Sequence, residues 1–151
     1  MLQLARPDDR ERIEVLAQQI HGLHVQMRPD VYELTPEMWT QERYDEAVAQ
    51  RQLFAAKLDD QIVGYALVRV RDYDGSGLVK HSALMIEEIC VDEPLRSHGI
   101  GSQIMTDIRA IAKAYGCDKL LLGVYPENVG AIAFYQKCGF SVRSINMQMM
   151  P

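Results

Sequence analysis

The chain has 151 residues, of which 48% are hydrophobic and 25% are charged, and its formal net charge at pH 7 is −5. This length is typical of one domain, spanning residues 1–151, that buries a substantial core. The acidic balance argues against a nucleic-acid partner and favours cationic substrates. No segment approaches the ~18 consecutive apolar residues of a membrane-spanning helix, so no membrane partner is expected.

The N-terminus, the cysteines and the histidines together predict a cytoplasmic protein without a metal. Residues 1–7 lack the basic region and apolar stretch of a signal peptide. The three cysteines are an odd number without metal-site spacing, which favours a reduced setting in which each is a small buried hydrophobe. His21 and His24 are three residues apart, but they lack a third ligand nearby, so we expect a solvated helix edge there and not a metal site.

The first third of the chain predicts a strand followed by two helices. Residues 1–5 form a short strand, and Pro7 starts a helix. The apolar positions of this helix follow its period: Ile13, Leu16, Ala17, Ile20 and Leu23. Residues 27–30 end it. Thr35 then caps, and Pro36 opens, a second helix that runs to about residue 50.

The middle of the chain predicts a hairpin, a strand and a strongly periodic helix. Leu53–Leu58 and Ile62–Arg71 form the hairpin. A flexible turn at residues 73–77 precedes a strand that ends at Val91. The helix that follows ends at Gly116 and buries one face, which consists of Ile100, Ile104, Ile108, Ile111 and Tyr115.

The last part of the chain predicts three strands and one helix. A strand over residues 120–125 precedes a short helix over about 129–138. Two final strands, Phe140–Arg143 and Ile145–Met149, then close the domain. Because helices and strands alternate without an internal repeat, the sequence predicts an α/β fold.

The turn Arg96-Ser97-His98-Gly99-Ile100-Gly101 joins a strand to a helix and predicts an anion site. N–H groups at a helix start have no intrahelical partner, and the helix dipole adds partial positive charge. Glycines at 99 and 101 let a ligand approach the backbone, and Arg96 adds a charge suited to phosphate. The alternative is a glycine-rich turn without a ligand. Ser102 and Ile104 stand where a Walker loop and a dinucleotide fingerprint need lysine and glycine.

A second motif occupies residues 128–140. Asn128 is a good helix N-cap, and Gly139 suits the residue after the helix. One face of the helix between them carries, at helical spacing, Ala131, Phe134, Tyr135 and Cys138.

The patterns Arg-x-x-Gly-x-Gly and Asn-x-x-Ala-x-x-Phe-Tyr-x-x-x-Gly-Phe resemble two motifs of the GNAT acetyltransferase superfamily, and the resemblance covers roughly residues 52 to 145. It implies a GNAT fold, with a mixed, mostly antiparallel sheet flanked by helices. It also implies acetyl-CoA as cosubstrate, no metal, and direct acetyl transfer in a ternary complex to a primary amine of a small molecule or peptide. A non-catalytic acyl-CoA-binding or sensing domain is the alternative function, and a homodimer stays open.

The resemblance also implies which residues contact the coenzyme. These are Ile89, Cys90, Val91, Arg96, Ser97, His98, Gly99, Ile100, Gly101, Ser102, Asn128, Ala131, Phe134 and Tyr135. Backbone groups of Ile89 and Val91 would bind the pantetheine amides as an added strand does. An exposed loop histidine is an equal account of His98, and Asn128 can act as a cap and as a contact.

Acetyl transfer needs a base, because an alkyl amine titrates near ~10, and an acid for the leaving thiolate. Glu87 lies nine residues before Arg96, a position that matches the catalytic glutamate of the spermidine/spermine branch of the family. Strand alternation would place Glu88 on the opposite face, and both carboxylates could instead face solvent. The family pattern makes Tyr135 the acid, whereas periodicity alone would make it a core residue.

The resemblance implies an acceptor site built mainly from the first two helices and their connection. This segment supplies four candidate substrate-binding residues: His24, Arg28, Tyr32 and Trp39. Residues 30–46 also carry six acids against one arginine. These acids form either a solvated helix face or an acidic vestibule for a cationic amine.

Overall fold

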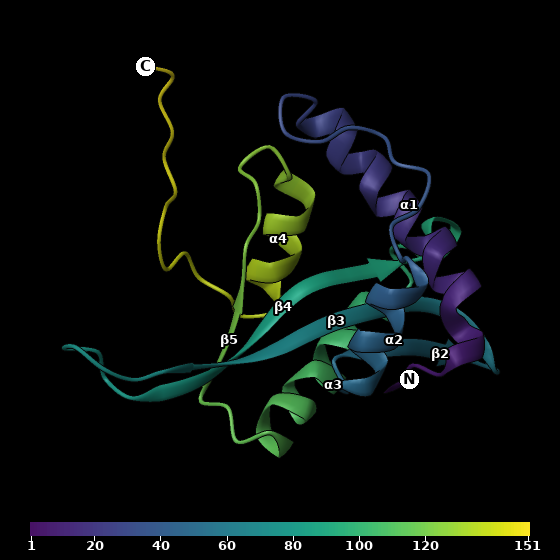
Figure 1. Ribbon diagram of the computed structural model, residues 1–151, viewed down its shortest axis with the longest axis horizontal. Helices are drawn as coiled ribbons and strands as arrows, with labels where there is room; N and C mark the ends of the chain where they lie inside the picture. The colour runs from purple at the N-terminus through teal and green to yellow at the C-terminus, as the bar shows by residue number, and fades with distance from the viewer.

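The computed structural model describes all 151 residues (Figure 1). In chain order the elements are β1 (Leu2–Leu4), the 3-10 turn η1 (Pro7–Asp9), α1 (Arg10–Met27), α2 (Gln41–Ala49), β2 (Leu53–Leu58), β3 (Gln61–Tyr73), β4 (His81–Val91), the 3-10 turn η2 (Glu93–Leu95), α3 (Ile100–Ala114), β5 (Lys119–Leu122) and α4 (Val129–Lys137).

The five strands form one sheet in the order β1-β2-β3-β4-β5. Every neighbouring pair is antiparallel except β4 and β5, which run parallel. The predicted mixed, mostly antiparallel sheet is therefore confirmed. β4 pairs with β3 along its whole length, but with β5 only over Ala83–Ile86.

Each face of the sheet has its own apolar core. α1 and α2 cover one face, where Ile13, Leu16, Trp39, Tyr44 and Tyr65 are completely buried. α3 and α4 pack on the other face, which holds the second core (Figure 1). The periodic positions predicted for α1 and α3 are buried, or half-buried at Ile20 and Ile111, except at the helix ends, where Leu23 and Tyr115 are 40% and 39% exposed.

The second helix begins later than the sequence predicts. Thr40, and not Thr35, caps α2, because its side chain accepts a hydrogen bond from the Arg43 N–H. The preceding residues are held by α1 instead: the Glu14 carboxylate accepts hydrogen bonds from the N–H groups of Met38 and Trp39. These two N–H groups are thus satisfied without a helix.

The two final strands predicted from the sequence are absent. Residues 140–151 form no helix or strand, and residues 141–151 are all exposed. Figure 1 shows this last stretch, in yellow, extending away from the sheet and helices. A strand needs a partner edge, and this segment makes no hydrogen bond with any strand of the sheet.

None of the helices combines the length and the hydropathy needed to cross a membrane.

Candidate active site

The start of α3 presents a row of unpaired donors. Gly99 is the N-cap with a left-handed φ of 82°, and the first intrahelical bond runs from the Gln103 N–H to the Gly99 carbonyl. The six backbone N–H groups from Ser97 to Ser102 have no hydrogen-bond partner in the chain. Together with the helix dipole, they make a site for an anion.

The backbone of residues 96–99, which precede α3, has an unusual conformation. Ser97 also has a positive φ, of 66°, which is uncommon for a residue with a side chain. His98 is exposed, and its Nδ1 donates to the Arg96 carbonyl over 2.8 Å. The Arg96 Nε donates to the Val91 carbonyl over 3.0 Å, so the loop is tied back to the end of β4.

Gly101 has a packing role that differs from the predicted one. A Cβ at this position would lie 3.2 Å from Cζ of Phe134 and 3.9 Å from Cγ2 of Val91. Its lack of a side chain therefore lets α3 approach α4, whereas Gly99 is needed for its left-handed backbone. The Ile100 side chain is 7% exposed and belongs to the core, so only its backbone faces the loop.

β4 and β5 separate in front of this loop. The last ladder pair is Ile86 with Leu122, so residues 87–91 have no strand on their β5 side. Figure 1 shows the chain after β5 diverging from β4. Side chains of this part of β4 alternate, with Cys90 3% exposed in the α1 core and Ile89 packed toward α3. The free edge can accept an extended ligand by backbone hydrogen bonds.

α4 brings Asn128 and Tyr135 to the same region. The Asn128 side chain accepts a hydrogen bond from the Ala131 N–H over 3.2 Å, which confirms the predicted cap. Tyr135 packs against the rings of Phe134 and Phe140. Burial raises the pKa of Tyr135 to about 12, with a smaller contribution from Cys138.

Glu87 and Glu88 share one face of the sheet, contrary to the prediction from alternation. Leu67 pairs with Glu88 but Val68 with Ile86, so Glu87 is the extra residue of a β-bulge. The bulge cancels the alternation at this point.

The partners of the two carboxylates lie on the α2 face. Glu88 Oε1 accepts from Arg43 Nη2 over 2.5 Å and Oε2 accepts from the Tyr65 hydroxyl over 2.7 Å. The Glu87 carboxylate has longer contacts with Arg69 and Arg71, at 3.2 and 3.4 Å.

Three of the four predicted acceptor residues come together. The His24 ring stacks on Tyr32 at 5.3 Å, and the Tyr32 and Tyr125 hydroxyls are 3.1 Å apart. The Arg28 guanidinium lies over the Tyr125 ring, 4.9 Å from its centroid. The cluster therefore joins the end of α1 to the β5–α4 loop. Burial, with the nearby His21, lowers the pKa of His24, so its imidazole is neutral at pH 7.

Trp39, the fourth, does not belong to this cluster. Its side chain is completely buried between the rings of Tyr44 and Tyr65, apart from the cluster, and its contact with a substrate stays a prediction. Its indole instead carries the Arg43 guanidinium 3.9 Å above the ring.

Several of the neighbouring acids are engaged locally. Asp30 pairs with Arg28, and Glu37 with Arg10, across exposed surface. His21 is 7% exposed and hydrogen-bonds the Glu33 carbonyl, so it does not lie on the solvated edge predicted for it. No group of three or more potential metal ligands occurs in the chain.

Sequence analysis missed Tyr125 and a groove between α3 and α4. The groove has a volume of about 230 Å³ and is lined by Ser102, Met105, Thr106, Arg109, Lys137 and Cys138. Ser102 links it to the row of free N–H groups, and Arg109 and Lys137 make it cationic. Tyr125 directly precedes Pro126, at the end of the predicted strand, a loop position that signals function more often than packing.

Comparisons with known proteins agree with this architecture. The model of the acetyltransferase (GNAT) family matches residues 18–140. The uncharacterized N-acetyltransferase YvbK of Bacillus subtilis is 28% identical over 103 residues, which are 68% of this chain and 61% of that protein. A probable glucosamine 6-phosphate N-acetyltransferase of Oryza sativa subsp. japonica is 36% identical over 73 residues, 48% of this chain and 40% of its own length. These matches thus cover less than two thirds of either relative.

Two solved structures have the same fold. A mutant of the BH1408 protein from Bacillus halodurans superposes with a TM-score of 0.94 at 25% identity, covering 100% of this chain and 99% of its own. The aminoglycoside N-acetyltransferase AAC(6')-Iy in complex with CoA superposes with a TM-score of 0.69 at 17% identity, covering 100% of this chain and 93% of its own.

Proposed function

Because this chain belongs to the acetyltransferase (GNAT) family, we propose that it moves an acetyl group from acetyl-CoA to a primary amine of a small molecule or peptide, by direct transfer in a ternary complex. The observation that carries the proposal is the row of unpaired N–H groups from Ser97 to Ser102, next to the free edge of β4. These two features would hold the pyrophosphate and the pantetheine arm respectively, because the loop follows β4 closely in the chain.

The residues present fit this cosubstrate. The N–H groups of the loop and the Arg96 guanidinium would hold the pyrophosphate, and the backbone of Ile89–Val91 would bind the pantetheine amides. Arg109 and Lys137, in the groove beside Ser102, suit the remaining phosphate of the nucleotide. Acetyl-CoA supplies an activated thioester carbonyl, which an amine attacks once it has lost its proton.

Glu87 is the residue that we propose as the base. Each oxygen of Glu88 already accepts a short hydrogen bond, at 2.5 and 2.7 Å, whereas the contacts of Glu87 are longer. The arginines beside Glu87 are about half exposed, so water can reach this carboxylate and relay a proton. Glu88 would act as a positioning residue, because it holds Arg43 of α2 and Tyr65 of β3 together.

Tyr135 is the residue that we propose as the acid. A pKa near 12 keeps its hydroxyl protonated at all physiological pH values, so a proton is always available on it. A thiolate leaving in the same desolvated surroundings would also have a raised proton affinity. Donation of the proton while the carbon–sulfur bond breaks would then cost less than donation to a thiolate in water.

The acceptor would bind at the cluster of His24, Arg28, Tyr32 and Tyr125. Two of the similar proteins are named for amine-bearing sugars, glucosamine 6-phosphate and aminoglycosides. An amino sugar fits this cluster because aromatic faces bind the ring and tyrosine hydroxyls bind its hydroxyl groups.

A panel of amines tests the proposed function. The purified chain is mixed with acetyl-CoA and each amine, among them amino sugars, polyamines and lysine peptides, and free thiol is followed. Amine-dependent release of thiol supports the proposal. Coenzyme binding without thiol release for any class of amine would favour the alternative, a non-catalytic acyl-CoA-binding domain.

A further inference from the structure

The carboxylate of Asp92 lies directly after β4, before the loop that carries the free N–H groups. Its Oδ1 accepts a hydrogen bond from Gln19 Nε2 over 2.8 Å, and its Oδ2 accepts one from Arg12 Nη2. The Gln19 amide makes a second bond, because its Oε1 accepts from the Glu93 N–H over 2.9 Å. The hydrogen bond from Gln19, together with the Arg12 guanidinium, holds the pKa of Asp92 below its ordinary value. The folded chain therefore stabilises the ionised carboxylate in this place.

These contacts from α1 fix the start of the 3-10 turn η2. The Asp92 carbonyl accepts from the Leu95 N–H over 2.9 Å, and the Glu93 carbonyl accepts from the Arg96 N–H over 3.3 Å. The two residues that α1 holds are thus the same two that accept the hydrogen bonds of the turn. Ser97, the first of the six free donors, follows the turn by one residue. The position of these donors therefore depends on where α1 places Asp92 and Glu93.

The polar contacts of Arg12 and Gln19 are separate from those that attach α1 to the sheet. The apolar face of the helix is completely buried at Ile13, Leu16 and Ala17, and this burial already holds α1 in place. Arg12 and Gln19 are seven residues apart, so they lie on one face of the helix, two turns from each other. What this polar face adds is a fixed position for the residues that precede the loop.

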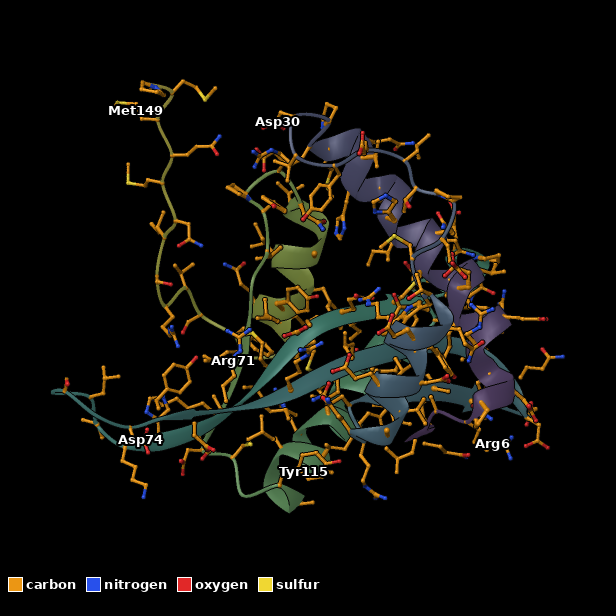
Figure 2. The ribbon with its side chains drawn as sticks, viewed as in Figure 1. Arg6, Asp30, Arg71, Asp74, Tyr115 and Met149 are labelled. Carbon is orange, nitrogen blue, oxygen red and sulfur yellow. The ribbon has the colours of Figure 1, made fainter.

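Another face of α1 holds the connection between α1 and α2. Gln18 Nε2 donates to the Glu14 carboxylate over 2.8 Å and to the Thr35 carbonyl over 3.2 Å. Figure 2 shows this connection leaving the end of α1 near Asp30. Gln18 and Gln19 are thus neighbours in the chain whose amides hold different segments.

We propose that Arg12, Gln19 and Asp92 are positioning residues for coenzyme A. They act through the backbone that precedes the loop, and they hold it so that the six free N–H groups converge on the pyrophosphate. The inference rests on the proposed function, because it takes coenzyme A as the ligand of the loop. It extends the coenzyme site to α1, whose other end carries His24 and Arg28 to the proposed acceptor cluster. One helix would then position both substrates.

An exchange of hydrogen-bond partners tests this role, with titration calorimetry of coenzyme A as the measurement. In Gln19→Glu an oxygen replaces the Nε2 donor and faces the Asp92 carboxylate. The dissociation constant should therefore rise about tenfold, the equivalent of one lost hydrogen bond. Asp92→Asn alone should also weaken binding, because its amide nitrogen then faces the donor of either Gln19 or Arg12.

The double variant Gln19→Glu, Asp92→Asn restores the pairing with its direction reversed. The amide introduced at position 92 donates to the carboxylate introduced at position 19, and its oxygen still accepts from Arg12. This variant should recover most of the affinity for coenzyme A. A general loosening of α1 would not be repaired by a second substitution, so the recovery separates positioning from stability.

Gln18→Glu is the matched control, because the same substitution again faces a carboxylate, that of Glu14, but on the side of the α1–α2 connection. It should lower Tm and leave the affinity for coenzyme A unchanged. Three results would overturn the inference: a Gln19→Glu chain that binds as tightly as the unsubstituted one, an equal loss in Gln18→Glu, or a double variant that stays weak. An unsubstituted chain that bound no coenzyme A would instead overturn the proposed function.

Discussion

The two faces of the sheet differ in how their polar groups are satisfied. On the α3 side, the six N–H groups from Ser97 to Ser102 are free, and no strand pairs with the β5-side edge of residues 87–91. On the α2 side, the charged groups are already paired: Arg43 with Glu88, and Arg69 and Arg71 with Glu87. The proposed coenzyme side thus has free backbone donors for a ligand, whereas a ligand on the α2 side must compete with existing partners.

The largest expected effect lies at Tyr135, on the face of the sheet that α3 and α4 cover. Tyr135→Phe should lower kcat about 10²–10⁴-fold with little change in acetyl-CoA affinity, since only proton transfer in the transition state is lost. Because the pKa of Tyr135 is raised to about 12, its ionisation should not reduce kcat of the unsubstituted chain below about pH 10. Steady-state kinetics and calorimetry measure these two quantities.

Tyr73→Phe is the matched control, because Tyr73 lies at the far end of β3, stacked on His81. A Tyr135→Phe variant with normal kcat would show that this residue only packs the core.

Glu87→Gln tests the α2 face of the sheet, and its effect on activity should be smaller than that of Tyr135→Phe. Loss of the base should lower kcat/KM about 10²-fold at neutral pH. The rise of kcat/KM with pH should move to higher pH, because free amine must then come from solution. Full pH profiles of both proteins measure this shift.

An unshifted profile for Glu87→Gln, combined with a loss of activity in Glu88→Gln, would move the base to Glu88. Both carboxylates occupy the same face, so acetyl transfer would survive that reassignment.

Arg96→Ala tests the anion site formed by the free N–H groups of residues 97–102. A charge-assisted phosphate contact contributes roughly 1.5–3 kcal/mol, so the dissociation constant for coenzyme A should rise about tenfold or more. Titration calorimetry measures it, with Lys113→Ala near the far end of α3 as the control. Equal affinity for Arg96→Ala and the unsubstituted chain would remove Arg96 from the phosphate site.

Glu88→Gln should have the smallest effect, on stability and not on catalysis. The partly exposed pair with Arg43 contributes about 1 kcal/mol, which corresponds to a fall in Tm of roughly 2–4 °C. Thermal unfolding measures it against Glu42→Gln, an exposed α2 carboxylate without a partner. A Tm equal to that of the control would show that Glu88 does not hold α2 against β3.

The local structure of the proposed coenzyme face was predictable, because its sequence signals act between residues that are close in the chain. Gly99 predicts a turn and Asn128 a helix cap at their own positions, and the apolar periodicity predicts α3 and α4. The structure has the turn, the cap and both helices at these positions. The acceptor face depends on distant contacts. The Glu14 carboxylate accepts hydrogen bonds from the N–H groups of Met38 and Trp39, more than twenty residues away in the chain. These residues therefore do not join a helix, α2 begins after them, and Trp39 is buried.

Two further differences between the sequence predictions and the structure, at Glu87 and in the final segment, depend on how strands pair. The bulge at Glu87 is a property of how β3 and β4 align, and the sequence of β4 alone does not contain it. The final segment has the alternation of a strand, but alternation shows only which side would be buried and not which edge would bury it.

The incomplete pairing of β4 has a thermodynamic consequence. A ligand that occupies the free edge of residues 87–91 binds the folded chain and not the unfolded one, so the proposed coenzyme binding would link the domain's stability to the coenzyme concentration. At a hundred times the dissociation constant this linkage adds about 2.7 kcal/mol to the free energy of unfolding. The cellular supply of coenzyme would then set both the turnover of this protein and the fraction of it that is folded.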